Sequence, residues 1–368
     1  MAALTAILVV NAGSSSLKLR VLSDADEVLD TADLPAPRGV TDAAALEKAI
    51  GSLGQAGEIA AVGHRIVHGG DLFSGPVLIG PEVRQRLESL VDLAPLHQPK
   101  SLAALDAVQA VLPGVPAVGC FDTAFHATIG EPAATYALPA EWRARWTLRR
   151  YGFHGLSHGY VSRRALALAG GSRRVVSCHL GAGASLAAVQ DGRSVDTTMG
   201  FTPLDGLVMA TRSGSVDPGL LMWLEEHAGT PPTELAATLE YRSGLYGLAG
   251  TADMREVLTR AAAGDARAIL ARDVYLHRLR GLIAAMAAAM DGLDTLVFTG
   301  GIGENSAEIR SLAMAGLGFL GVREDAARNA EGTGDREIGA DGAPVHSLLI
   351  AAREDLEIAR QVRQVLSA

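Results

Sequence analysis

Two stretches of the chain share one plan: an apolar run, a short loop of glycine and other small residues including serine, and a second apolar run. The first is AILVVNAGSSSLKLRVL (residues 6–22), and the second is RRVVSCHLGAGASLAAVQDG (173–192). Each pattern is typical of two antiparallel strands joined by a tight turn. One such hairpin in each half of the chain predicts a duplicated fold in which both loops face a shared cleft.

The rest of the sequence alternates strand-like apolar runs with helical stretches rich in Ala and Leu, which indicates a mixed α/β protein. With 368 residues, 48% of them apolar, the chain is long enough for two domains with separate cores. The pattern restarts near residue 150, where YGFHGLSHGYV leads into the second hairpin. We therefore expect a domain boundary there.

Composition excludes several classes of protein. A net charge of −9 argues against binding to nucleic acid or anionic membranes, which requires clustered Lys and Arg. Cys120 and Cys178 lie in apolar runs without C-x-x-C spacing, which predicts buried free thiols in a reducing compartment. The apolar run at 281–290 is too short to span a membrane, and the N-terminus lacks the features of an export signal. These observations predict a cytoplasmic protein with no membrane partner.

Three loops of small residues are candidate phosphate sites: NAGSSS (11–16), GAGASL (181–186) and GGIGENS (300–306). The G-x-x-x-x-G-K-[ST] pattern of a P-loop is absent, and none of the three has the full dinucleotide fingerprint. Backbone N–H groups and hydroxyls at such turns can bind an anion. A single loop of this kind could be only a turn, but three in one chain favour phosphate binding.

Two arginines are candidates for binding oxyanions. Arg65 lies in GHRIVHGG and Arg212 in TRSGSVDPG. A planar guanidinium suits carboxylate or phosphoryl oxygens, which it can bind in a bidentate way. The alternative, of equal weight for each residue alone, is a structural ion pair of Arg65 with Asp71 and of Arg212 with Asp217.

An aspartate and several histidines complete the polar candidates. Asp122 follows a strand, in CFDTAFH, where it could cap a helix, bind Mg²⁺ or transfer a proton. His154 and His158 are spaced as i and i+4, but no third ligand lies nearby, so a zinc site is not expected. We interpret His64, His68 and His158 as structural.

Nine motifs occur in a fixed order: VVNAGSSSLK, GHRIVHGG, LAPLHQP, FDTAFH, YGFHGLSH, HLGAGAS, FTPLDGL, TRSGSVDPG and FTGGIGENS. Together they resemble the acetate/propionate/butyrate kinase family from about residue 6 to 362. The resemblance implies a two-domain actin/sugar-kinase/heat-shock-type (ribonuclease H-like) α/β fold with a duplicated βββαβα core and an interdomain cleft. It also implies a homodimer. Within each chain it implies an N-terminal domain of residues 1–150 plus 356–368 and a C-terminal domain of 151–355 that carries the adenosine site.

The implied activity is the reversible transfer of the γ-phosphoryl group of ATP to acetate, which gives acetyl phosphate and ADP and needs Mg²⁺ or Mn²⁺. The resemblance assigns catalysis to Asp122, His154 and Arg212, metal binding to Asn11 and Glu354, and substrate binding to Arg65, Val67, Leu96, Phe153 and Pro203. It assigns nucleotide binding to Ser14, Ser16, Lys18, His179, Leu180, Gly181, Ala182, Gly183, Asp253, Met254, Arg255, Gly301, Ile302, Gly303, Glu304 and Asn305.

The chemistry of a carboxylate acceptor agrees with these roles. A carboxylic acid with a pKa of about 4.3 is already an anionic nucleophile at neutral pH, so no general base is required. Catalysis must bring two anions together and neutralise the charge on the transferred group. We therefore expect Asp122 to position Mg²⁺ or an arginine and not to move a proton.

The sequence departs from the family pattern at four positions. Ala182 stands where Asn is usual, Asp205 where Glu is usual, Ser215 where an acidic residue is usual, and Ala210 where Gly is usual. The loss of an amide at Ala182 leaves the identity of the phosphoryl donor open.

The sequence constrains the identity of the phosphoryl acceptor more than that of the donor. Val67 leaves limited room beside a methyl group, which favours acetate over propionate or butyrate, although one methylene is worth only about 1–3 kcal/mol. A non-catalytic nucleotide switch is the alternative from another class. The presence of Arg65, His154 and Arg212 argues against it, because a switch needs no carboxylate clamp.

Overall fold

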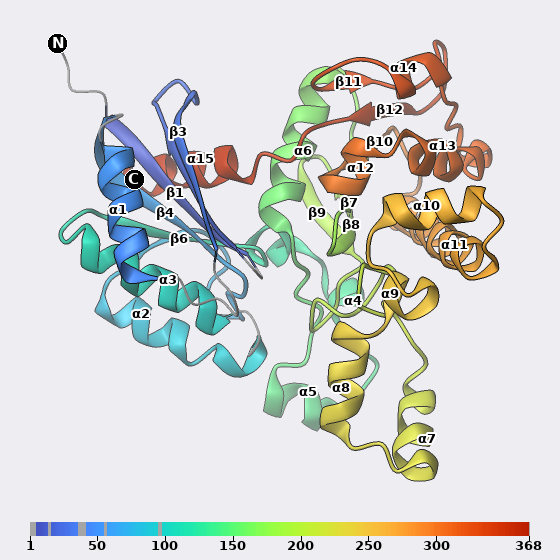
Figure 1. Cartoon of the computed structure of the whole chain (residues 1–368), viewed down its shortest axis with the longest axis horizontal. Coiled ribbons are helices and arrows are strands. Elements are labelled where there is room, and N and C mark those ends of the chain that lie inside the picture. Colours follow the sequence, from blue (N-terminus) through green and yellow to red (C-terminus); the bar gives the residue numbers. More distant parts are fainter. Residues whose placement is uncertain (1–4, 14–15, 36–41, 55–56, 95–97, 368) are drawn as a thin grey trace. The chain divides into compact units, whose positions relative to one another are not determined.

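The computed structural model describes residues 5–13, 16–35, 42–54, 57–94 and 98–367 (Figure 1). Contacts within the chain divide it into two units. Unit 1 comprises Met1–Ala127, Phe153–Tyr160 and Arg353–Ala368, and unit 2 comprises Thr128–Gly152 and Val161–Ala352. The domain limits at 150 and 356 remain a prediction.

Six strands of the described chain form the sheet of unit 1, in the order β3-β2-β1-β4-β6-β5. The strands are β1 (Thr5–Ala12), β2 (Ser16–Leu22), β3 (Val28–Pro35), β4 (Glu58–Ile66), β5 (Val77–Leu78) and β6 (Ala117–Phe121). β1, β2 and β3 are antiparallel neighbours, whereas β4 runs parallel to β1 and β6 parallel to β4. β5 closes the edge antiparallel to β6.

The described sheet of unit 2 repeats this connectivity, in the order β9-β8-β7-β10-β12-β11. Its strands are β7 (Arg174–Leu180), β8 (Ala184–Gln190), β9 (Arg193–Thr197), β10 (Thr295–Thr299), β11 (Arg336–Glu337) and β12 (His346–Leu349). Again three antiparallel strands are followed by two parallel ones and a short antiparallel edge strand. The predicted duplication of a βββαβα core is confirmed, and β1–β2 and β7–β8 are the two predicted hairpins.

Alternation along β1 places its side chains in two cores. Leu8 and Val10 pack with α1 (Ala43–Leu53) and α3 (Gln98–Val111), whereas Ile7 and Val9 pack with α15 (Glu354–Leu366) on the other face. In β4, a Cβ on Gly63 would lie only 2.4 Å from Ile358 Cγ2. Glycine there lets α15, from the far end of the chain, lie close against the sheet and so places Glu354.

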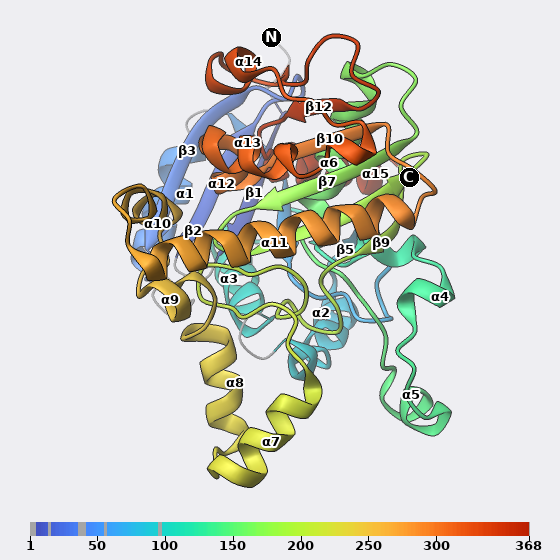
Figure 2. The same cartoon turned by 90° about the vertical axis from the view of Figure 1, so that its right-hand side faces the viewer.

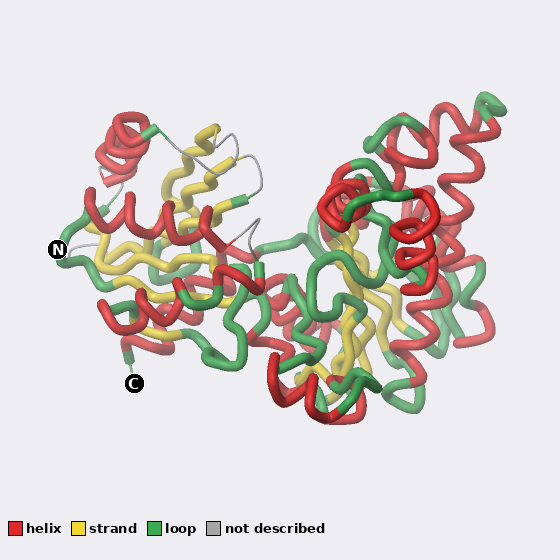
Figure 3. The backbone as a smooth tube through the Cα atoms, turned by 90° about the horizontal axis from the view of Figure 1, so that it is seen from below, coloured by secondary structure: helices red, strands yellow, loops and turns green. Residues whose placement is uncertain are grey.

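Helices cover both faces of each sheet (Figure 3). In unit 2, α11 (Ala266–Ala288) lies across β7 and β8 and buries Tyr275, Leu279 and Ile283 (Figure 2). The other helices are α2 (Pro81–Glu88), α4 (Glu131–Ala134), α5 (Ala140–Trp146), α6 (Gly155–Leu168), α7 (Pro218–Ala228), α8 (Pro232–Tyr241), α9 (Gly244–Ala249), α10 (Met254–Ala262), α12 (Gly300–Asn305), α13 (Ala307–Ala315) and α14 (Ala326–Ala330). None of the described helices is both long enough and apolar enough to cross a membrane.

Both cysteines are free and buried, as predicted. The GGIGENS stretch, in contrast, is predicted above as a loop, and its first six residues form the short helix α12. Gly300 begins α12 with a φ of 78°, and Ser306 then caps α13 by accepting a hydrogen bond from Ile309 N.

Candidate active site

A buried ion pair joins two neighbouring strands of unit 1. Arg65 lies near the end of β4 and Asp122 directly follows β6, and the two strands run parallel. Arg65 Nε lies 3.0 Å from Asp122 Oδ1, and Nη2 lies 2.6 Å from Oδ2. The Asp122 side chain is only 1% exposed. Arg65 therefore pairs with Asp122 and not with Asp71.

The charges of this pair depend on each other. Burial alone would lower the pKa of Arg65, but the negative charges of Asp122 and Glu354 outweigh it and raise that pKa. Burial raises the pKa of Asp122 above its usual value, and the charge of Arg65 opposes this rise. A bidentate pair of this kind holds the guanidinium in one orientation. This geometry supports a positioning role for Asp122.

Asn11 extends the pair to the start of α15. Its Oδ1 accepts a hydrogen bond from Arg65 Nη1 at 3.1 Å, and its Nδ2 donates one to Glu354 Oε2 at 2.8 Å. Asp122, Arg65, Asn11 and Glu354 thus form one connected chain, which we call the Arg65 cluster. Two carboxylates and one guanidinium give it a net negative charge, which favours a bound cation.

The residues of the cluster fit magnesium. Carboxylate and amide oxygens are ligands that Mg²⁺ accepts, and it usually takes one or two carboxylates together with water and phosphate oxygens. Among the described residues, no three His, Cys, Asp or Glu side chains are grouped to hold a metal by themselves. Asn11 and Glu354 therefore suit an Mg²⁺ ion that arrives with phosphate ligands of its own.

The segment that carries His154 lies next to the Arg65 cluster. His154 has a left-handed φ of 55°, which costs a non-glycine residue roughly 1–3 kcal/mol and is common at functional sites. Gly155 N donates a hydrogen bond to Asp122 O at 2.8 Å, and a Cβ on Gly155 would lie 2.3 Å from that oxygen. The segment that carries His154 is thus fixed to the backbone of Asp122.

The four apolar residues predicted to bind the substrate lie in different parts of the chain. Val67 and Phe153 are buried in unit 1, Pro203 belongs to unit 2, and Leu96 lies outside the described residues. The rings of Phe153 and His68 meet edge to face, with centroids 5.4 Å apart.

His126, which the sequence did not single out, lies 3.0 Å from Phe153 O through its Nε2. Burial lowers the pKa of both His68 and His126 to about 4. Both rings are therefore neutral at neutral pH and add no charge around Phe153.

The two hairpin loops differ in how much of them is described. In unit 1, Ser14 lies outside the described residues, and Gly13 N donates to Ser16 O at 2.8 Å. Asn11 is directly opposite Lys18 across β1 and β2, so their side chains share a face of the sheet. In unit 2, His179 and Leu180 end β7, and Gly181 N donates to Gly183 O at 3.1 Å.

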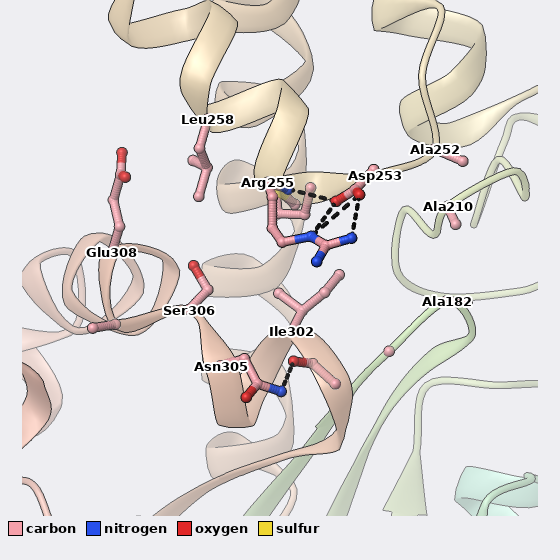
Figure 4. A pocket seen from close by; sticks show the side chains of 14 residues that line it. Ala182, Ala210, Ala252, Asp253, Arg255, Leu258, Ile302, Asn305, Ser306 and Glu308 are labelled. Carbon is pink, nitrogen blue, oxygen red and sulfur yellow. Dashed lines mark hydrogen bonds and ion pairs between the residues drawn. The ribbon is translucent and has the colours of Figure 1, made fainter. Parts of the chain in front are cut away.

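A pocket of about 850 Å³ in unit 2 gathers several of the predicted nucleotide residues (Figure 4). Its lining residues are Gly181, Ala182, Ala210, Ala252, Asp253, Met254, Arg255, Leu258, Gly301, Ile302, Asn305, Ser306, Ala307 and Glu308. A volume of this size with mostly apolar walls and a few polar groups suits a nucleoside.

Five of the nucleotide residues predicted in unit 2 do not line this pocket, namely His179, Leu180, Gly183, Gly303 and Glu304. Glu304 has a structural role, because its Oε1 accepts from Gly300 N at 2.9 Å and from Ala352 N at 3.0 Å. Leu258 and the start of α13 also line the pocket but could not be predicted from the sequence, because their apolar or mixed side chains form no motif.

Polar side chains of the pocket are held by their neighbours. Asp253 caps α10 and pairs with Arg255, with Nη2 and Oδ2 2.6 Å apart. The hydrogen bond from Arg255 lowers the pKa of Asp253 to about 2. Asn305 Nδ2 donates to Gly301 O at 2.8 Å (Figure 4).

The four departures from the family pattern form two contacting pairs. Ala210 N donates to Ala182 O at 3.1 Å, and both residues line the pocket. Ser215 Oγ donates to Asp205 Oδ1 at 2.5 Å. The departures within each pair are therefore neighbours, and the first pair gives the pocket a wall of two methyl groups.

Arg212 lies in a loop of unit 2. Its Nε and Nη2 both lie 2.7 Å from Glu240 Oε1. The sequence had suggested Asp217 as the alternative partner, but the Asp217 side chain accepts from Gly219 N at 2.9 Å and caps α7. Glu240 lies in none of the nine motifs and is not among the predicted site residues.

Comparisons with known proteins agree on one family. The model of the Acetokinase family matches residues 30–360. The chain is 49% identical over 318 residues to the acetate kinase of Synechococcus sp. (strain JA-2-3B'a(2-13)), covering 85% of this chain and 78% of the relative. It is 43% identical over 396 residues to the acetate kinase of Leifsonia xyli subsp. xyli, covering 99% and 100%.

Solved structures give the same result. The acetate kinase of Porphyromonas gingivalis matches with a TM-score of 0.89 and 36% identity, and a propionate kinase from Francisella tularensis matches with a TM-score of 0.90 and 36% identity. Each match covers 98% of this chain and 100% of the other. The fold is that of phosphotransferases with a carboxyl acceptor. The chain belongs to the acetokinase family.

Proposed function

We propose that the protein transfers the γ-phosphoryl group of ATP to acetate, reversibly and in one step. An acetate oxygen forms a bond to the γ-phosphorus, the bond from that phosphorus to the β–γ bridging oxygen breaks, and ADP leaves. No proton is transferred. The observation that carries the proposal is the Arg65 cluster, which offers a fixed guanidinium for an anion and oxygen ligands for a cation.

Arg65 is the acceptor-binding residue in this proposal. Acetate is an anion at neutral pH, because its pKa is close to the value of about 4.3 for Glu. Asp122 holds the Arg65 guanidinium in one orientation and acts as a positioning residue. Val67 and Phe153 provide apolar surface for the methyl group, and we assign Leu96 and Pro203 to the same role by the family resemblance.

Asn11 and Glu354 are the residues proposed to hold Mg²⁺, or Mn²⁺, which accepts the same oxygen ligands. The ion would neutralise charge on the β- and γ-phosphoryl oxygens. The net negative charge of the Arg65 cluster supports this assignment.

The pocket of unit 2 is proposed to bind the nucleoside of ATP or ADP, with the phosphates toward the loop of Gly181–Gly183. His179, Leu180, Lys18 and the serines of the first hairpin are proposed phosphate-side residues. His154 and Arg212 are proposed to stabilise charge on the transferred group. Phosphoryl transfer requires both substrates to be bound at once, so both sets of residues should be needed for turnover.

Propionate is the second candidate acceptor, since the Francisella protein with a TM-score of 0.90 is named a propionate kinase. One additional methylene changes binding by only about 1–3 kcal/mol in such a pocket. The limited room that Val67 leaves beside a methyl group favours the smaller acid.

We also propose a cytoplasmic homodimer. Exposed apolar side chains are concentrated on α7 and the end of α8, where Leu220, Met222, Trp223 and Tyr241 are each between 48% and 61% exposed. Helices α5, α7 and α8 project from the sheet of unit 2 (Figure 2). These exposed side chains support the proposal, because exposed apolar patches are typical of protein interfaces.

The test is acyl-phosphate formation, trapped as the hydroxamate, with acetate, propionate and butyrate, each paired with ATP, GTP and pyrophosphate. We expect the highest kcat/KM for acetate with ATP. A higher value for propionate would reassign the acceptor, and a higher value for pyrophosphate would reassign the donor. The absence of acyl phosphate with every pairing would refute the proposal.

A further inference from the structure

The loop that carries Arg212 is fixed by its backbone against the end of α8 and the start of α9. Ser213 N donates to Leu239 O at 3.1 Å, and Ser243 N donates to Thr211 O at 2.9 Å. Gly244, with a φ of 61°, passes so close that a Cβ there would lie 2.6 Å from Arg212 O. These contacts place the main chain of Arg212 without any help from the Glu240 side chain.

The Glu240 carboxylate contacts the guanidinium of Arg212. A single oxygen, Oε1, lies 2.7 Å from both Nε and Nη2 of Arg212. The two side chains are 17% and 14% exposed, so solvent screens their attraction less than that of a surface pair. A long arginine side chain has several accessible rotamers, and a charge-assisted contact of this kind restricts them.

We propose that Glu240 is a positioning residue that aims the Arg212 guanidinium for phosphoryl transfer. The inference rests on the proposed function, and it goes beyond that function by assigning a role to a residue that lies in none of the nine family motifs. Glu240 does not touch the substrates in this assignment. It fixes the direction of the Arg212 N–H groups. Its negative charge also offsets part of the positive charge that Arg212 presents to the transferred group.

Thr211 provides a matched control, because it ties the same loop to the same residue by a different bond. Thr211 Oγ1 donates to the backbone oxygen of Glu240 at 2.9 Å. The variant T211A removes a tether of the loop and leaves the ion pair of Arg212 intact. If the loop needs Glu240 only for stability, T211A and E240A should behave alike.

The experiment compares the wild type, E240A, E240Q, E240D and T211A in steady-state kinetics for acetate and ATP and in thermal unfolding. A guanidinium that is displaced by about 1 Å can cost roughly 100-fold in rate, so we expect E240A to lower kcat by about 10- to 100-fold. The KM values for acetate and ATP should change by less than about threefold. E240Q, which keeps an acceptor oxygen at the same reach, should be nearer to the wild type than E240D, which keeps the charge but is shorter.

We expect T211A to lower the unfolding temperature while its kcat stays within about threefold of the wild type. If E240A matches T211A in kcat, or if E240A is faster than the wild type, the inference is wrong while the proposed function stands. If E240D retains more activity than E240Q, charge and not direction is what Glu240 supplies, and the positioning role is again wrong. If the wild type itself forms no acyl phosphate, the proposed function fails first, and the inference fails with it.

Discussion

Arg65 Nε and Nη2 donate to the two carboxylate oxygens of Asp122, with contacts of 3.0 Å to Oδ1 and 2.6 Å to Oδ2, at adjacent ends of β4 and β6. The geometry commits both carboxylate oxygens of Asp122 to one guanidinium. A carboxylate held in this way is suited to orient Arg65 and is poorly placed to accept a proton from a substrate. The substrate of a carboxylate kinase, moreover, has no proton to give.

The variant D122N tests this relationship. We expect kcat/KM for acetate to fall at least about tenfold, because the amide cannot form two charge-assisted hydrogen bonds with Arg65. The pH–rate profile should keep its shape. The control D71N changes an exposed aspartate that does not pair with Arg65, and it should leave the kinetics unchanged. A shifted pH–rate profile in D122N would mean that Asp122 transfers a proton.

Substitution of Arg65 and of Arg212 should change different kinetic constants. R65A should raise the KM for acetate by about 10- to 100-fold, the factor that corresponds to losing hydrogen bonds of roughly 1.5–3 kcal/mol to a charged group. R212A should chiefly lower kcat, since its contact is proposed to form with the transferred group. Steady-state kinetics of both variants separate the two roles. An equal effect of R65A and R212A on the acetate KM would contradict the assignment.

The metal assignment is tested at the start of α15. E354Q should raise the Mg²⁺ concentration required for half-maximal activity by about tenfold or more, because it removes a charged metal-site group. D355N is the matched control on the next residue, whose carboxylate pairs with Arg353 at 2.9 Å. Titration of Mg²⁺ into protein stripped with a chelator gives the measurement. Identical Mg²⁺ dependence in E354Q and the wild type would exclude Glu354 from the metal site.

Acid should destabilise unit 1 through buried histidines. Burial lowers the pKa of His64, His68 and His126 to about 4, from an ordinary value of 6.5. Between about pH 6.5 and pH 4 the unfolded chain therefore binds protons that the folded chain does not, so the free energy of unfolding falls as the pH falls. Each histidine contributes at most about 3 kcal/mol, since one pKa unit is worth about 1.4 kcal/mol.

Urea unfolding at neutral pH and at about pH 5 measures this loss. H64Q removes one titrating group and should lose less stability between the two pH values than the wild type. H227Q, which changes an exposed histidine on α7, should retain the wild-type loss. An equal loss in H64Q and the wild type would show that His64 does not contribute to the pH dependence.

The sequence predicts the architecture well because short segments of the chain determine its strands and turns. The two hairpins are predicted from apolar runs interrupted by small residues. Each pattern lies within about 20 residues and does not depend on contacts with distant parts of the chain. GGIGEN was harder, because glycine disfavours helices by about 1 kcal/mol per residue. Its contacts with the end of β7, where Gly300 lies close to the Leu180 backbone, outweigh that preference.

The partners of the two arginines could not be predicted in the same way. The partners that the sequence offers, Asp71 for Arg65 and Asp217 for Arg212, are close to the arginines along the chain. The actual partners, Asp122 and Glu240, are brought near by the pairing of β4 with β6 and by the packing of the Arg212 loop on α8. Ion pairs depend on which elements are neighbours in space, and a single sequence carries little information on that.

Phosphorus NMR of the purified protein with ATP, acetate and Mg²⁺ tests the central claim most directly, because it resolves every phosphorus-containing product in one sample. We expect an acetyl phosphate resonance to grow at the rate at which the γ-phosphorus of ATP disappears, with ADP formed in equal amount. Inorganic phosphate as the only new product would mean that the protein is an ATPase that does not use acetate as an acceptor, and it would contradict the proposal that this chain is a carboxylate kinase.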